Sequence, residues 1–130
     1  MAIPNRFQSG FRLEDGDALN EALATPQLQT HANITALAGG ALSASTPVLT
    51  LGANEVTTVA SSGDSVVLPK AVLGAVIFVA NAGANSMQVF ANGSDTINGT
   101  AGATGVAQAN AKSALYVAAD AGQWYRILTA

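Results

Sequence analysis

The chain has 130 residues, a formal net charge of −3 and no cysteine. This length fits one domain with a single core. Charged residues make up only 10 % of the chain and hydrophobic residues 49 %, whereas about 25 % charge is usual for a globular protein. A monomer with so few charged residues has a poorly solvated surface. The composition therefore favours a surface that is partly covered by other copies of the chain.

The same composition argues against several classes of partner. The five basic residues are scattered and form no stripe that could neutralise a run of phosphates, so we expect no nucleic-acid binding. Without cysteine there is neither a disulfide framework nor a thiolate site, which fits assembly in a reducing cytosol. The first ten residues do not show the pattern of a signal peptide. The longest apolar run, Ala71 to Ala82, is too short to cross a bilayer and predicts a buried strand.

Residues 1–25 are expected to form a segment distinct from the rest, because charge is concentrated there. Arg6 and Arg12 stand near Phe7 and Phe11 in a stretch interrupted by a proline and a glycine. Such a stretch favours an extended arm. Its cations and aromatic rings make these four residues candidates for contact with a partner surface.

A short helix is predicted at the end of this segment. Asp17 is suited to cap a helix over Ala18–Ala24, and Pro26 would end it. Leu19 and Leu23 would then lie on one face of the helix. Two turns with two leucines are not stable alone. The helix must therefore dock, either on its own β-domain or on another subunit.

Residues 26–46 are rich in Ala, Ser, Thr and Gly and show little periodicity, so we interpret them as a linker with room for one short strand. Residues 47–130 are predicted to form a β-domain, because short β-prone runs alternate with Gly, Asn and Asp turns. The expected strands are Val48–Leu51, Val56–Ala60, Ser65–Leu68, Ala75–Ala80, Ser86–Ala91, Ala114–Ala118 and Gln123–Leu128. This spacing predicts an all-β fold, a small antiparallel β-sandwich or barrel.

No residue pattern indicates a catalytic, cofactor or metal site. His31 is the single histidine and has no apparent partner for acid–base work. Asp64, Asp95 and Asp120 each stand in a turn, where capping explains them better than calcium binding. The glycine-rich stretch at 99–105 lacks the lysine of a phosphate-binding loop. We therefore expect a protein that is not an enzyme.

Aromatic residues offer a second candidate surface. Phe78 and Tyr116 fall in the middle of expected strands and are predicted to lie in the core. Trp124 and Tyr125 are adjacent, so in a strand they face opposite sides. One of them is expected to be buried and the other to be a contact residue, which makes the pair a candidate for surface recognition.

Four pieces follow one another along the second half of the chain: Leu68-Pro69, the hairpin from Gly74 to Asn85, the turn from Gly93 to Gly99, and the terminal Gly122–Tyr125. Together they resemble a recurring segment of tailed-bacteriophage virion proteins: capsid decoration (cement) proteins, head fibres and tail-fibre modules. The stretch GFRLEDGDALNEA, from residue 10, also looks like N-terminal segments of phage structural proteins.

The resemblance implies a virion structural protein on the capsid exterior, assembled in the host cytoplasm. Its expected partners are the major capsid protein and further copies of itself, as a homotrimer. The residues expected to contact the capsid or a neighbouring subunit are Arg6, Phe7, Phe11, Arg12, Leu19 and Leu23. The alternative is a head- or tail-fibre module that recognises host-surface glycans through its loops and through Trp124 and Tyr125. A carbohydrate-binding module of a cellular enzyme is a third interpretation.

Overall fold

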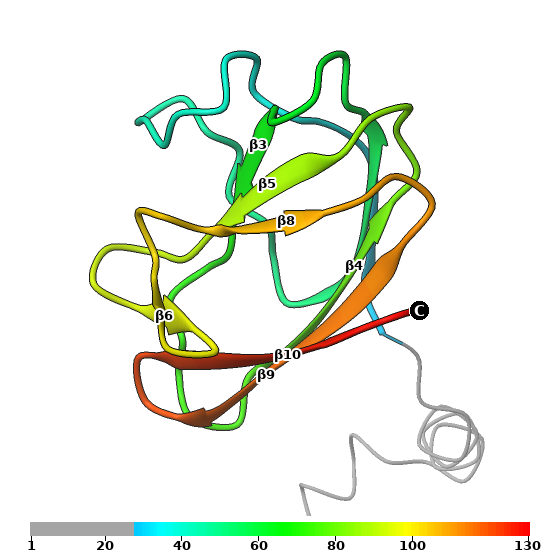
Figure 1. The fold of residues 1–130 in the computed structure, drawn as a ribbon. Helices are drawn as coiled ribbons and strands as arrows, with labels where there is room; N and C mark the ends of the chain where they lie inside the picture. Colours follow the sequence, from blue (N-terminus) through cyan, green and yellow to red (C-terminus); the bar gives the residue numbers. More distant parts are fainter. Residues whose placement is uncertain (1–27) are drawn as a thin grey trace, which may run out of the picture.

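The computed structural model describes residues 28–130, and every regular element in this part of the chain is a β-strand (Figure 1). The predicted all-β class is thus confirmed. The arm and the helix predicted at Ala18–Ala24 lie outside the described residues. The strands are β1 (Thr30–Thr35), β2 (Gly52–Thr58), β3 (Ser65–Val67), β4 (Val76–Asn81), β5 (Met87–Phe90), β6 (Thr96–Ile97), β7 (Thr100–Ala101), β8 (Val106–Gln108), β9 (Ser113–Asp120) and β10 (Gln123–Leu128).

The strands form two sheets. The larger sheet has seven strands in the order β1-β2-β4-β9-β10-β6-β7, and the smaller has three in the order β3-β5-β8. In Figure 1 the smaller sheet lies above β9 and β10, and β8 leads through a loop into β9. β4 and β9 are the central strands of the larger sheet, since β4 pairs with β2 on one side and with β9 on the other.

From β1 to β5 the chain forms a β-solenoid-like coil. Strands β2, β3, β4 and β5 alternate between the two sheets, so each pairs with the strand two places along the chain rather than with the next one. β2 is parallel to β4, and β3 is parallel to β5. β1 extends the coil by pairing in parallel with β2.

The strand directions correct the expectation of an antiparallel fold. Four of the eight pairings between the described strands are parallel, namely β1 with β2, β2 with β4, β3 with β5, and β6 with β10. The coil explains the first three pairings: a strand that returns to the same sheet after a full turn runs in the same direction as before. The pairing of β6 with β10 lies outside the coil. Antiparallel pairing appears after β5, where β8, β9 and β10 pair with β5, β4 and β9, respectively.

The strand predicted at Val48–Leu51 is only a single bridge, from Val48 to Val67, and β2 begins at Gly52, between two of the expected strands. Gly52 lies in the left-handed region, with φ of 109°, and a side chain there would collide with the carbonyl oxygen of Gln29. Glycine therefore allows the chain before β1 to approach β2 closely. The Asn54 side chain is buried, and its Nδ2 donates a hydrogen bond to the Thr50 carbonyl at 2.7 Å. This polar side chain therefore fastens the start of β2 to the segment before it.

β1 lies within the stretch that was interpreted as a linker with room for one strand. Its pairing with β2 is interrupted between His31 and Ile34, where Asn33 has φ of 61°. Beyond β1, the side chains of Ala36 and Thr46 are buried. The described part of this stretch, from residue 28, therefore packs against the strands that follow it.

A single hydrophobic core connects the two sheets. Ile77, Val79, Tyr116 and Trp124 contribute to it from the larger sheet, and the smaller sheet contributes apolar side chains from β3 and β5. Each fully buried side chain of this size contributes about 1.5–3 kcal/mol to folding. β4 directs the alternate residues Ile77 and Val79 into the core and leaves its other side chains on the opposite face of the sheet.

Candidate functional site

The residues predicted to contact a capsid or a neighbouring subunit all lie before the described part of the chain. They are Arg6, Phe7, Phe11, Arg12, Leu19 and Leu23. The described residues therefore carry the remaining candidates for a functional surface, which are the aromatic pair, the faces of the two sheets, and the loops.

Trp124 and Tyr125 face opposite sides of β10, as the alternation predicts. Trp124 is completely buried, and its Nε1 donates a hydrogen bond to the carbonyl oxygen of Pro69 at 3.2 Å. Its assignment as a surface-recognition residue is therefore wrong. Tyr125 is 41 % exposed and its hydroxyl donates to Asp120 Oδ2 at 2.8 Å. This bond to Asp120 raises the pKa of the Tyr125 phenol.

The acidic residues considered for calcium bind backbone groups or other side chains instead. Asp64 accepts hydrogen bonds from the amides of Gly39 and Ser61, and Asp95 accepts one from the amide of Ala71 at 2.7 Å. Within residues 28–130 no three acidic, histidine or cysteine side chains gather where they could hold a metal ion. No helix in this range is long and apolar enough to span a membrane.

The most prominent surface feature is the face of the larger sheet that points away from the core. We call it the outer face and define it by Val76, Phe78, Leu115, Val117, Tyr125 and Ile127. These residues form two rows across three strands: Tyr125 pairs with Val117 and Val117 with Val76, whereas Ile127 pairs with Leu115 and Leu115 with Phe78. Residues in register lie on the same face of a sheet. The six side chains therefore make one continuous patch.

The outer face is both exposed and free of formal charge. Ile127 is 68 % exposed and Val76 is 39 % exposed, and Phe78, Leu115 and Val117 are half-buried. The prediction that Phe78 belongs to the core is thus wrong, because β4 places it on the opposite side from Ile77 and Val79. Large exposed apolar patches mark interaction sites in proteins.

A hollow of about 250 Å³ continues the second row of the outer face beyond Phe78. It is lined on β2 and β4 by Ala53, Glu55 and Ala80, and His31 borders it on β1. Ala53 is the register partner of Phe78, so one row runs from the protruding Ile127 to this hollow. A protrusion and a hollow thus lie at opposite ends of the same row.

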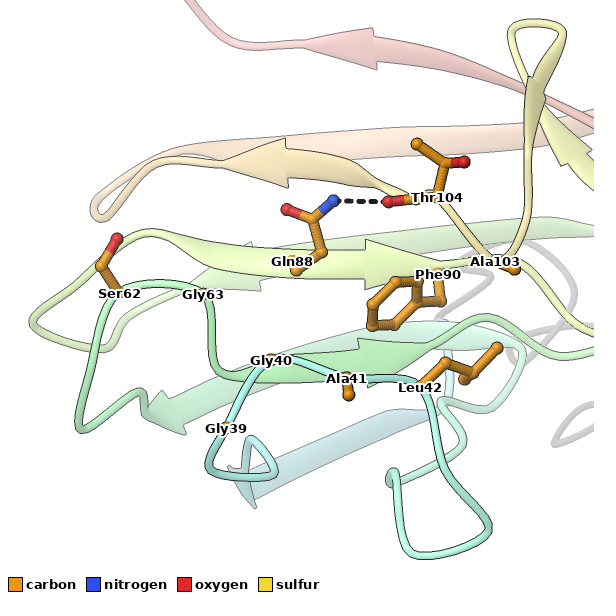
Figure 2. Close-up of a pocket in the computed structure, with 10 residues that line it drawn as sticks. All are labelled: Gly39, Gly40, Ala41, Leu42, Ser62, Gly63, Gln88, Phe90, Ala103 and Thr104. Carbon is orange, nitrogen blue, oxygen red and sulfur yellow. Dashed lines mark hydrogen bonds between the residues drawn. The ribbon is translucent and has the colours of Figure 1, made fainter.

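The second surface feature is an open cleft of about 640 Å³ beside the smaller sheet, shown in Figure 2. Its lining comes from three loops and from β5: Gly39, Gly40, Ala41, Leu42, Ser62, Gly63, Gln88, Phe90, Ala103 and Thr104. Figure 2 shows the Phe90 ring between β5 and the loop of Gly39 to Leu42. The Gln88 side chain extends the other way and donates from Nε2 to the carbonyl oxygen of Thr104 at 2.8 Å.

The loops around the cleft are held by specific contacts. The buried Asp64 joins two of them, since its Oδ1 accepts from the Gly39 amide at 3.3 Å and its Oδ2 from the Ser61 amide at 2.9 Å. Gly40 has φ of 70°, and a side chain there would meet the carbonyl oxygen of Gly63 at 2.7 Å. The two loops therefore touch through their backbones, which fixes this wall of the cleft.

A buried polar network supports the larger sheet below its outer face. Gln108 is completely buried; its Nε2 donates to the carbonyl oxygens of Val79 at 2.9 Å and Lys112 at 3.0 Å, and its Oε1 accepts from the Tyr116 hydroxyl at 3.1 Å. Burial raises the pKa of Tyr116 to about 12, although the neighbouring Arg126 opposes this shift. Tyr116 thus stays neutral, and its hydroxyl donates a hydrogen bond to Gln108 Oε1.

Sequence reasoning missed most of the outer face. Leu115, Val117 and Ile127 were assigned to strands but not to a surface, although their alternation with buried residues is visible in the sequence. The cleft had no sequence signal, because its lining combines short segments that are far apart along the chain.

The comparisons with known proteins identify no relative. No family model, no curated protein and no solved structure matches the chain.

Proposed function

We propose that the protein is a structural protein of a bacteriophage virion, a decoration or cement protein that binds the outer surface of the capsid and stabilises the head. In this proposal it has no enzymatic activity and assembles with itself, as a homotrimer. The two sheets and their shared core would form a small sandwich, which presents the outer face to neighbouring copies. The observation that carries the proposal is the uncharged, apolar outer face.

A second copy of the chain is the occupant that fits the outer face best. The six residues of the patch carry no formal charge, so a copy that covers them buries no unpaired ion there. The exposed Glu55, which lines the hollow, must stay in contact with water or gain a partner in such a contact. Ile127 protrudes at one end of a row and the hollow beside Phe78 lies at the other end. A protrusion of one copy that enters the hollow of the next makes a head-to-tail contact, and such contacts close into rings when the rotation allows it. A ring of three copies is the proposed assembly.

Attachment to the capsid is assigned to the N-terminal segment, with Arg6, Phe7, Phe11 and Arg12 as the proposed contacts. A trimer would present three such segments together. Binding at several points gains from multivalency, so contacts that are weak individually can hold firmly. A protein that binds only the assembled shell stabilises that shell by mass action.

A head- or tail-fibre module that recognises host-surface glycans is the second candidate function. The observation that favours it is the open, loop-lined cleft beside β5. Since Trp124 is buried, Tyr125 is the member of the aromatic pair that remains as a surface contact in this alternative.

Heat release of the genome and adsorption to host cells, measured side by side on particles with and without the protein, separate the two functions. A cement protein predicts that particles lacking it still form but release their genome at a lower temperature. An adhesin predicts stable particles that fail to adsorb. Loss of adsorption with unchanged heat release would reject the cement function.

A further inference from the structure

The cleft beside β5 has the features of a binding site for a small ligand. Its volume of about 640 Å³ lies in the range of sites for small molecules. Its walls are fixed by the Asp64 hydrogen bonds and by the backbone contact between Gly40 and Gly63. A wall that is already ordered loses little conformational freedom when a ligand binds, which favours affinity.

The chemistry of the lining indicates a neutral ligand. None of the ten lining residues is acidic or basic. The nearby Asp64 carboxylate is buried, and each of its oxygens already accepts a backbone amide. An anionic or cationic ligand would therefore lose water without gaining an opposite charge.

The lining combines hydroxyl and amide groups with apolar surface. Ser62 and Thr104 carry hydroxyls. Gln88 bonds to Thr104 through Nε2, and within residues 28–130 its Oε1 remains as an acceptor. Leu42, which is 37 % exposed, supplies apolar surface, whereas the Phe90 ring is almost completely buried beside the cleft. A pyranose ring presents both hydroxyls and an apolar C–H face, so a sugar matches this combination of groups.

The position of the cleft argues against a peptide that binds as an added strand. β5 is the middle strand of the smaller sheet, and β3 and β8 already occupy its two edges. Strand addition requires an unpaired edge. A ligand in the cleft would therefore contact side chains and the backbone amides of loops, and not the free edge of a strand.

We propose that this cleft binds a neutral saccharide of two or three sugar units. This inference rests on the second candidate function, since it names the class of ligand that the same cleft would bind. It is separate from the proposed assembly, because the cleft lies beside the smaller sheet and the outer face belongs to the larger one. Absence of sugar binding would therefore reject this inference and leave the assembly unaffected, whereas adsorption of particles tests the fibre function itself.

Two-dimensional NMR spectra of the ¹⁵N-labelled full chain, titrated with neutral and charged sugars, test the proposal. The neutral probes are maltotriose, N,N′,N″-triacetylchitotriose and lactose, and the charged probe is 3′-sialyllactose. The proposal predicts millimolar or tighter binding of at least one neutral sugar, with shifts at the amides of Gly39 to Leu42, Gly63 and Thr104. Silence with all neutral sugars, binding of the charged sugar alone, or shifts elsewhere in the chain would overturn it.

A matched pair of variants sharpens this test. Ala41→Trp places a large ring in the cleft from an exposed loop position, whereas Ala44→Trp adds the same ring to an exposed position of the same connection outside the lining. The first variant should weaken sugar binding at least tenfold and the second should leave it unchanged. Equal affinity of Ala41→Trp and the unmodified chain would contradict the assignment. Thermal melting checks that both variants fold.

Discussion

The substitution Ile127→Asp tests the outer face as the contact between copies. The Ile127 side chain is 68 % exposed in the single chain. Full burial of an isoleucine contributes about 1.5–3 kcal/mol, so covering the part that remains exposed is worth about 1–2 kcal/mol per contact. Three contacts in a trimer give about 3–6 kcal/mol, or on the order of 10²–10⁴ in the dissociation constant. A buried, unpaired carboxylate weakens the contact further.

Size exclusion coupled to light scattering over a concentration series measures this effect. The unmodified chain should behave as a trimer, and Ile127→Asp should shift it to monomer at the same concentration. Val48→Asp is the matched control, because Val48 is 57 % exposed but bridges to β3 of the smaller sheet. An unmodified chain that is monomeric at tens of micromolar, or a trimer that Ile127→Asp leaves intact, would refute the reasoning.

Three further predictions concern the arm and the buried network. Deletion of residues 1–24 should leave a folded β-domain by circular dichroism but weaken binding to capsid shells; equal decoration by the truncated chain would show that the arm is not the anchor. Gln108→Met should lower the free energy of unfolding by about 1–3 kcal/mol in urea denaturation, because it leaves the Tyr116 hydroxyl without its acceptor and removes a donor from the carbonyl of Val79. The Lys112 carbonyl loses the same donor but keeps its bond from the Asn81 amide. A loss well under 1 kcal/mol would contradict this role. Because burial raises the pKa of Tyr116 from 10.0 to about 12, its contribution to stability should be complete below about pH 10 and fall by about 2–3 kcal/mol as the pH rises to 12. Urea unfolding at graded alkaline pH checks this, and Tyr116→Phe should remove that part of the dependence.

The strands with a clear alternation could be predicted from the sequence. β4, β9 and β10 were each located to within about two residues, because buried and outward side chains alternate along them. β8 was missed, since it has three residues and includes the buried Gln108, whose polar side chain conceals the pattern. Element boundaries in such short runs depend on hydrogen bonds to distant segments.

Strand direction and the two surfaces could not be predicted. Short strands joined by tight turns favour antiparallel hairpins, whereas the coil from β1 to β5 arises because successive strands join different sheets. That choice depends on the packing of the whole core. The cleft likewise joins residues near positions 40, 63, 89 and 104 of the chain. The alternation of Trp124 and Tyr125 indicated that one is buried, but only the contact with Pro69 identifies Trp124 as that residue.

Cryo-electron microscopy of the intact particle that carries this protein tests the central claim most directly. The account predicts density for the β-domain on the outside of the capsid, in groups of three copies whose outer faces are covered by one another. The N-terminal segments should run from each group toward the shell. Density on the tail, or separate copies whose Ile127 and Val76 face solvent, would contradict the account.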